Sequence, residues 1–227
     1  ASGQPTGVLF EAAMGLVKDR MPGPDAAQMA EHVRAAIARA QRGGLTGVHD
    51  FDGAVAFQAY QLLHAQGALN FRIVKNIPVE LLDHAISLGL RWGFGDDFLR
   101  IGGVKMFAEG ALGPRTAWMV EPYEGEPENT GISTMDPEEM MACVSRASAA
   151  GLPSTIHAIG DLAVHHVLNV YEAVRKEEAA RGVAPDRRRH RIEHVQLIHP
   201  DDTGRLGALG IIASMQPNHA TSDMEMA

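Results

Sequence analysis

The 227-residue chain is poor in cysteine, in aromatic residues and in positive charge, and these shortages exclude several classes of protein. Cys143 is its single cysteine, so no disulfide can form within the chain, and a reducing compartment such as the cytoplasm is expected. Lys and Arg number 20 against 28 Asp and Glu, and the net charge of −8 argues against a nucleic-acid partner or an anionic membrane surface. No apolar run approaches the ~18 residues that cross a membrane.

Hydrophobic residues nevertheless make up 45% of the chain, which is enough to build a folded core. Short β-rich runs alternate with longer stretches whose apolar residues recur every three or four positions. The first such stretch opens at Asp25, with Gln28 at the spacing of a capping box, and ends at Gly43. The alternation predicts strands at 45–49, 71–74, 101–107, 154–157, 191–194 and 210–215, with a helix before the first strand and helical segments between successive strands.

Repeated strand–helix–strand units predict a parallel sheet covered by helices, closed either as a doubly wound open sheet or as a barrel. No Gly-rich nucleotide fingerprint and no phosphate-loop lysine follows any strand. This absence argues against a doubly wound, nucleotide-binding open sheet. The chain opens at Ala1 without a methionine, stops at Ala227, and holds about six of the eight strands that a barrel needs. We expect an incomplete (β/α)8 TIM barrel, strands 2 to 7, over residues 1–227.

Residues 109–134 interrupt this alternation. They have no period, contain Pro114, Pro122 and Pro127, and are far longer than a usual connection. Loops of this length in α/β domains are typically lids or binding loops. Arg115 and Trp118 are therefore candidates for substrate contact, although both are equally suited to anchoring the loop itself.

Histidines close several predicted strands, at the end where a parallel barrel places its active site. Period-2 alternation puts Thr155 and His157 on one face of their strand, and Ile192 and His194 on one face of theirs. If both faces are the barrel interior, two imidazoles on neighbouring strands point at one volume. Neutral imidazole is a common ligand of Zn²⁺, so a metal site is one interpretation.

Other polar residues have a structural interpretation. Alternation places Glu193 on the face opposite His194 and beside Arg191, where an ion pair accounts for it. His49 is interpreted as hydrogen-bonded scaffold, and the basic run 187–191 as a solvated turn ahead of a strand. Surface or packing roles are expected for the helical histidines His32, His64, His84, His165 and His166.

Lys105 is the hardest residue to explain structurally. It shares one face of its strand with Phe107, while Val104 and Met106 share the other. A buried ammonium is costly unless it is paired or chemically changed. Three solutions stay open: an ion pair with a carboxylate, a lowered pKa for Schiff-base chemistry, or reaction of the neutral amine with CO₂ to a carbamate that could bridge two metal ions.

Four sets of residues together resemble one family. They are Val104–Ala117 (VKMFAEGALGPRTA), Gly7–Leu9 with Thr46–Asp50 (GVL, TGVHD), His157–Asp161 (HAIGD), and Arg191–Gln196 with Ser214–His219 (RIEHVQ, SMQPNH). They occur along the chain in the same order as the motifs of amidohydrolase family 3, which they resemble. The resemblance covers nearly the whole chain. That family is a branch of the metal-dependent amidohydrolase superfamily and includes formamide deformylases.

The resemblance implies a (β/α)8 barrel joined to a small β-sandwich made by flanking segments. It implies that Lys105 is the bridging, carboxylated lysine, that His157 and His194 are the metal ligands of strands 5 and 6, and that the catalytic candidate His219 lies near the substrate. Asp161 joins the two loop residues, Arg115 and Trp118, as a candidate for substrate binding.

The chain also departs from the family pattern. The His-x-His pair of strand 1, the catalytic aspartate of strand 8 and the sandwich strands have no counterpart in residues 1–227. Glu109 stands where an aspartate is usual, which leaves the role of this carboxylate open.

These observations predict part of a hydrolase that uses one or two divalent metals, most simply Zn²⁺, to cleave a non-peptide C–N bond. The expected substrate is a small N-acyl or N-formyl amide. Two alternatives stay open: a metal-free barrel enzyme that uses Lys105 as a Schiff-base nucleophile, and a non-catalytic scaffold or interaction domain. Oligomeric state and substrate identity are not encoded in these motifs.

Overall fold

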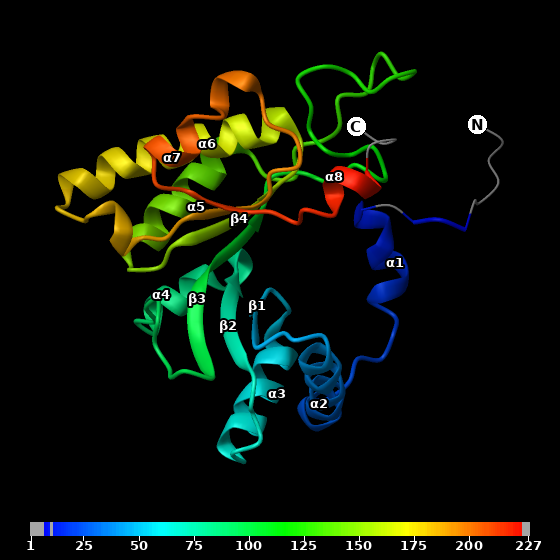
Figure 1. The fold of residues 1–227 in the computed structure, drawn as a ribbon, viewed down its shortest axis with the longest axis vertical. Coiled ribbons are helices and arrows are strands. Elements are labelled where there is room, and N and C mark those ends of the chain that lie inside the picture. The colour runs from blue at the N-terminus through cyan, green and yellow to red at the C-terminus, as the bar shows by residue number, and fades with distance from the viewer. Residues whose placement is uncertain (1–6, 10, 224–227) are drawn as a thin grey trace.

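A parallel sheet of six strands organises the chain in the computed structural model, which describes residues 7–9 and 11–223 (Figure 1). The strands pair in chain order, each with the next, and all pairs are parallel. They are β1 (Gly47–Asp50), β2 (Arg72–Pro78), β3 (Leu99–Phe107), β4 (Ser154–Ala158), β5 (Arg191–His194) and β6 (Ile212–Ser214).

The sheet curls into a half-barrel. Arg191 of β5 and His49 of β1 are four strands apart in the sheet, about 19 Å if the sheet were flat. The Arg191 Nη1 atom nevertheless lies 3.1 Å from both ring nitrogens of His49. The concave face is therefore the interior of a barrel segment, and the predicted fold class is confirmed.

Helices alternate with the strands as the sequence predicted. Before β1 come α1 (Gly15–Lys18), which follows a 3₁₀ turn at Glu11–Met14, and α2 (Ala26–Arg42). The later helices are α3 (Ala54–Ala65), α4 (Leu82–Ser87), α5 (Pro137–Ala149), α6 (Asp161–Ala180), α7 (Arg205–Ala208) and α8 (His219–Ser222). The capping box of α2 is present, with the Asp25 side chain accepting from the Gln28 N–H and the Gln28 side chain accepting from the Asp25 N–H.

Most strand bounds differ from the predicted ranges by one to four residues, and two helical segments begin as 3₁₀ turns. β2 continues to Pro78, and the helical segment after it begins as a 3₁₀ turn at Val79–Leu81 that leads into α4. The segment between β5 and β6 contains a 3₁₀ turn, Pro200–Asp202, and then the four-residue α7. No helix in the described part of the chain is both long and apolar enough to cross a membrane.

The convex face of the sheet packs on the helices. Val104, Met106, Ile156 and Ile192 are completely buried there, in one apolar cluster with residues of α5 and α6. Because side chains alternate along a strand, Lys105, Thr155, His157 and Arg191 project from the concave face. The strand pattern thus separates an apolar helix-facing layer from a polar interior.

The basic run 187–191 is only partly a solvated turn. His190 is fully buried: its Nδ1 accepts from the Ser154 N–H at 3.0 Å, and its Nε2 lies 2.9 Å from the Glu178 carboxylate of α6. Ser148 and Arg175 also donate to Glu178, at 2.5 and 2.6 Å. Burial raises the pKa of Glu178, but these hydrogen bonds outweigh it and lower the value to about 2. The network ties α5 and α6 to the start of β5.

Replacement of Glu178 by alanine is expected to lower the free energy of unfolding by about 3–5 kcal/mol, because the buried Arg175 and His190 lose their partner. Chemical denaturation of the full-length protein measures this. The matched control is Glu31→Ala, which removes an exposed carboxylate of α2 and should change stability by less than about 0.5 kcal/mol. Equal effects of the two substitutions would contradict the assignment.

Candidate active site

Lys105 lies on the concave face of β3 and is 6% exposed. Its Nζ donates to the Met106 carbonyl at 2.8 Å and lies 3.7 Å from the ring centroid of Phe107. Among the described residues no carboxylate forms an ion pair with it, so the ion-pair explanation finds no support in this part of the chain. Burial lowers the pKa of Lys105 to about 7, and the negative charge of Glu193 only partly offsets this.

His157 projects from the same face, one strand away. Its ring centroid lies 5.3 Å from that of Phe107. The Lys105 amine lies over the same Phe107 ring. The His157 Nε2 lies 2.7 Å from the Gly110 carbonyl oxygen and must donate to it. Burial lowers the pKa of His157 to about 4, and the nearby charges of Lys105 and His194 act in the same direction. The ring is therefore neutral at pH 7, with a free lone pair on Nδ1.

His194 reaches this site by a route that alternation did not predict. In the sheet, Ala158 pairs with His194 and Ile156 with Ile192, and both Ile192 and Ala158 are buried toward the helices. The prediction that Ile192 and His194 share the interior face is therefore wrong. Glu193 faces the interior with Arg191, and their side chains form an ion pair at 2.6 Å.

A local change of backbone turns the His194 ring inward. His194 and Val195 adopt left-handed φ values of 78° and 48°, which are uncommon for non-glycine residues and end the alternation. As a result the ring centroids of His157 and His194 lie 4.8 Å apart, at an interplanar angle of 73°. Strained backbone of this kind is typical of functional sites.

Hydrogen bonding also orients the His194 ring. Its Nδ1 lies 2.7 Å from the Gln216 Oε1, and the Gln216 amide nitrogen donates to the Ser214 carbonyl at 3.3 Å. Because the Gln216 oxygen can only accept, His194 carries its proton on Nδ1 and keeps a lone pair on Nε2. Each of the two neighbouring imidazoles therefore has one nitrogen held by the protein, and among residues 7–9 and 11–223 the other nitrogen has no hydrogen-bond partner.

His219, at the start of α8, extends this row of rings. Its centroid lies 6.1 Å from that of His194, and its Nδ1 lies 2.5 Å from the Asp223 carboxylate. Asp223 also accepts from the Gln196 side chain at 2.7 Å, which fixes the carboxylate in place. Sequence reasoning placed Gln196 and Gln216 in family motifs without giving them a role, and it missed Asp223, because nothing in a strand or helix period marks a side chain that orients another.

The three substrate-binding candidates lie where the long loop meets α6. Arg115 pairs with Glu126 inside the loop at 2.5 Å, and Trp118 stacks on His166 at 4.6 Å between ring centroids. Asp161 accepts from the Val120 N–H at 2.9 Å. All three hold the loop in place in this conformation, and their contact with substrate stays a prediction.

Glu109 has a role that the sequence left open. Its carboxylate is 2% exposed and accepts three backbone N–H groups, from Trp118, Ile159 and Gly160. Burial raises the pKa of Glu109 to about 7, although the three hydrogen bonds oppose the shift. This side chain fastens the loop to the turn between β4 and α6, beside the Gly110 carbonyl that holds His157.

Substitution of Glu109 by alanine leaves these three N–H groups without their acceptor. We expect amide hydrogen exchange at Trp118, Ile159 and Gly160 to accelerate at least 10-fold, since a lost buried hydrogen bond costs about 1–3 kcal/mol. Exchange monitored by mass spectrometry measures the effect. The control Glu126→Ala removes a loop carboxylate that is 42% exposed, and similar acceleration by both variants would argue against the role of Glu109.

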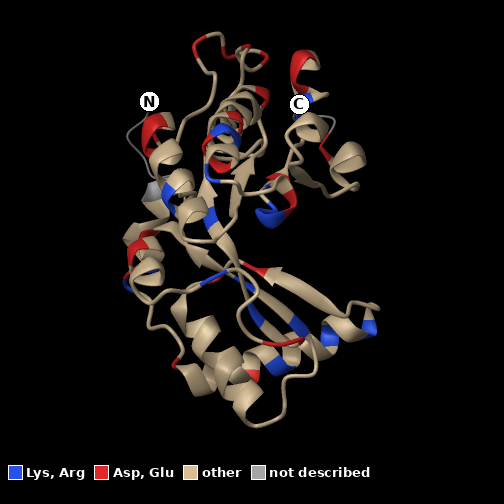
Figure 2. Cartoon of the chain, turned by 90° about the vertical axis from the view of Figure 1, so that its left-hand side faces the viewer, with Lys and Arg blue, Asp and Glu red and all other residues tan. Residues whose placement is uncertain are grey.

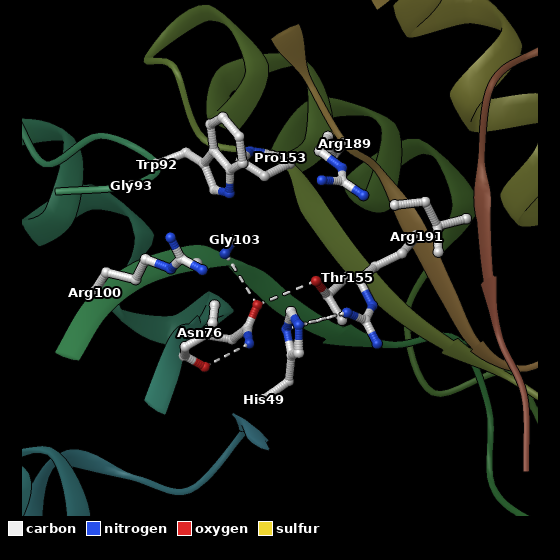
Figure 3. Close-up of a pocket in the computed structure, with 13 residues that line it drawn as sticks. His49, Asn76, Trp92, Gly93, Arg100, Gly103, Pro153, Thr155, Arg189 and Arg191 are labelled. Carbon is white, nitrogen blue, oxygen red and sulfur yellow. Dashed lines mark hydrogen bonds between the residues drawn. The ribbon is translucent and has the colours of Figure 1, made fainter. Parts of the chain in front are cut away.

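His49 belongs to a different part of the concave face. It lines a cavity of about 370 Å³ near the amino-terminal ends of the strands, together with Arg100, Arg189, Arg191 and Trp92 (Figure 3). Burial lowers the pKa of His49, and the positive charge of Arg191 lowers it further. The contact with Arg191 agrees with a scaffold role for His49, away from the His157 and His194 pair at the carboxyl ends.

A curled parallel sheet with imidazoles and a buried amine at the carboxyl side of its concave face defines a segment of a (β/α)8 barrel with a candidate active site at the usual end. The comparisons with known proteins agree. The chain belongs to the Amidohydrolase family, whose sequence model matches residues 1–227.

Three named relatives match nearly the whole chain. It is 35% identical to Protein LONG AFTER FAR-RED 3 of Arabidopsis thaliana over 99% of this chain and 40% of that protein. It is 32% identical to a Bacillus subtilis (strain 168) protein named as the amidohydrolase YtcJ, and 28% identical to the N-substituted formamide deformylase of Arthrobacter pascens. These two matches cover 98% and 96% of this chain and 41% of each relative. The chain thus spans about two-fifths of its relatives' length.

A solved structure gives the same result. An uncharacterized metal-dependent hydrolase from Pyrococcus furiosus superimposes with a TM-score of 0.80 at 29% identity, over 93% of this chain and 42% of that one. The fold and the branch of the family agree with these relatives.

Proposed function

We propose that the protein containing this chain is a metal-dependent hydrolase that cleaves the C–N bond of small N-acyl or N-formyl amides. The observation that carries the proposal is the pair of neighbouring imidazoles, His157 and His194, each with one ring nitrogen held and the other free. Orientation of a metal-ligating imidazole by a second hydrogen bond is the usual design of such sites.

The donor set suits a divalent cation, most simply Zn²⁺. His157 and His194 are nitrogen donors, and Lys105 provides a third group on the same face. Zinc takes three or four protein ligands, and no group of three or more His, Cys, Asp or Glu side chains within residues 7–9 and 11–223 could hold a metal. The proposal therefore requires further ligands from elsewhere in the protein, and one or two ions are compatible with it.

Lys105 would complete the set as a carbamate. Its neutral amine adds to CO₂ and releases one proton, giving a carboxylate-like group with two oxygen donors. Burial, the absence of a paired carboxylate among the described residues and a pKa of about 7 all favour the neutral amine that this reaction needs.

The cation would supply Lewis acidity and lower the pKa of a water molecule toward ~7. Residues of this chain would orient the metal-ligand rings and bind the substrate. The Gly110 carbonyl and the Gln216 side chain would hold the ring planes of His157 and His194 fixed. His219, whose Nδ1–H is held by Asp223, would donate an Nε2–H to the substrate carbonyl oxygen when the ring carries both protons.

A neutral substrate fits the charge around the site. The loop that follows β3 carries Glu121, Glu124, Glu126 and Glu128, and Figure 2 shows acidic segments along it. Negative potential there disfavours anionic substrates. The deformylase relative supports an N-formyl amide as one member of the class, and the single cysteine supports a cytoplasmic location.

Metal analysis of the full-length protein together with an amide-hydrolysis assay tests the proposal. We expect bound divalent metal, loss of activity after chelation, and recovery on addition of Zn²⁺. Full activity in protein that elemental analysis shows to be metal-free would overturn it.

Lys105 also favours a second candidate, a Schiff-base enzyme. A buried amine with a pKa of about 7 can attack a carbonyl carbon and release water to give an imine. Borohydride would reduce that imine to a stable amine. Mass spectrometry should then show an adduct at Lys105 with a carbonyl probe such as pyruvate, and the absence of an adduct would remove this candidate.

A further inference from the structure

A cavity of about 200 Å³ is lined by two of the site imidazoles, His194 and His219. The other polar lining residues are Gln196, Gln216 and Asp223. The other walls are mainly apolar and come from four separate segments: Leu112 of the long loop, Leu197 after β5, Met215 and Pro217 after β6, and Ala220 of α8.

The cavity offers no free charge. Asp223 is the acidic residue of its lining, and this carboxylate is already occupied by His219 and Gln196 at 2.5 and 2.7 Å. A charged substituent would therefore be desolvated there without a partner, whereas an apolar one would only lose water.

The walls differ in rigidity. Leu112 is 4% exposed and packs in a small apolar cluster with Leu197 and loop residues, so this side is held firmly. Met215 is 60% exposed, and its unbranched thioether side chain can adapt to different shapes. One firm wall and one adaptable wall suit a group of variable but limited size.

We propose that this cavity binds a compact apolar substituent of the amide substrate, a branched aliphatic or phenyl-sized group next to the scissile bond. The inference rests on the proposed amide hydrolysis and narrows its substrate class. The volume agrees with this size, since a cavity of about 150 Å³ accommodates benzene. The substituent lies on either the acyl or the amine side of the scissile bond. Two series of amide probes, one for each side, distinguish these two positions.

Binding is tested first, without catalysis. Full-length protein with ¹³C-methyl methionine is titrated with acetamide and isovaleramide for the acyl side, and with N-methylacetamide and N-isobutylacetamide for the amine side. The Met215 methyl signal is assigned through Met215→Leu. We expect the larger member of one series to shift this signal and to bind at least 10-fold more tightly than its small partner, because each buried methylene contributes about fourfold.

Catalysis is tested with Ala220→Phe, which fills the cavity from an exposed helix position. The measurement uses the amide series whose larger member shifts the Met215 signal. Its ratio of kcat/KM between the larger and the smaller amide should fall at least 10-fold. The matched control, Ala27→Phe at an exposed position of α2, should leave this ratio within twofold of wild type.

The outcomes separate this inference from the proposed function. Hydrolysis of the amides with no size preference in either series, and no Met215 shift, would overturn the cavity assignment and leave the hydrolase intact. A Met215 shift with the larger amide, without hydrolysis of any amide, would support the cavity and count against the hydrolase. An equal change of the ratio in Ala220→Phe and Ala27→Phe would also overturn the cavity assignment.

Discussion

Replacing His194 by asparagine in the full-length protein is expected to lower kcat/KM for amide hydrolysis by at least about 10³-fold and to reduce the metal retained after dialysis. Asparagine tolerates the left-handed backbone at this position, with φ 78°, so the fold should survive. The substitution removes the imidazole whose ring centroid lies 4.8 Å from that of His157. Steady-state kinetics and elemental analysis of the same preparation measure both effects.

Two further variants make this prediction sharper. Gln216→Ala leaves the ring in place but removes the acceptor of its Nδ1–H, so we expect a smaller loss of about 10- to 100-fold in metal affinity. His32→Ala removes an exposed imidazole of α2 and should change neither quantity. If His194→Asn retains wild-type metal content and activity, the imidazole pair is not the site.

Replacing Lys105 by methionine should change activity and stability in opposite directions. The apolar side chain fits beside Phe107 and ends the burial of an amine that no described carboxylate pairs with. We expect the free energy of unfolding at pH 7 to rise by about 1–3 kcal/mol, while kcat/KM falls at least about 10³-fold because the third donor is lost. A loss of both stability and activity would indicate that Lys105 is structural.

The pH dependence of stability gives an independent measurement on metal-free protein. The pKa of Lys105 falls from 10.5 to about 7 on folding, so between these values the unfolded chain binds more protons than the folded one. Stability of the wild type should therefore rise with pH across this window, relative to Lys105→Met, by at most about 1.4 kcal/mol per pH unit. Parallel stability curves for the two proteins would contradict a buried, neutral amine.

Much of the fold was predictable, because it depends on local patterns. The strands of the sheet and the long helices follow from alternating or three-to-four-residue spacing of apolar side chains, as at Val104 and Met106. The start of α2 follows from a capping box between Asp25 and Gln28, which spans four residues. Lys105 stood out for the same reason, since a charged residue inside a buried strand breaks the pattern.

Other features could not be predicted, since they depend on residues far apart in the chain. The basic run before β5 suggested a solvated turn, but Glu178 of α6 draws His190 into the core. Glu109 was known as a departure from the family pattern, yet its three N–H donors come from positions 9 to 51 residues away.

By itself the sequence determined the order of strands and helices, the parallel sheet and the identity of the side chains at its carboxyl end. Alternation of apolar residues encodes which face of each element is buried, and that is a local property. Only the tertiary structure decided that His194 turns inward, that Glu193 shares the interior with Arg191, and that Gln216 and Asp223 orient the rings. Left-handed backbone and long-range hydrogen bonds are set by the surrounding packing, which no periodic pattern records.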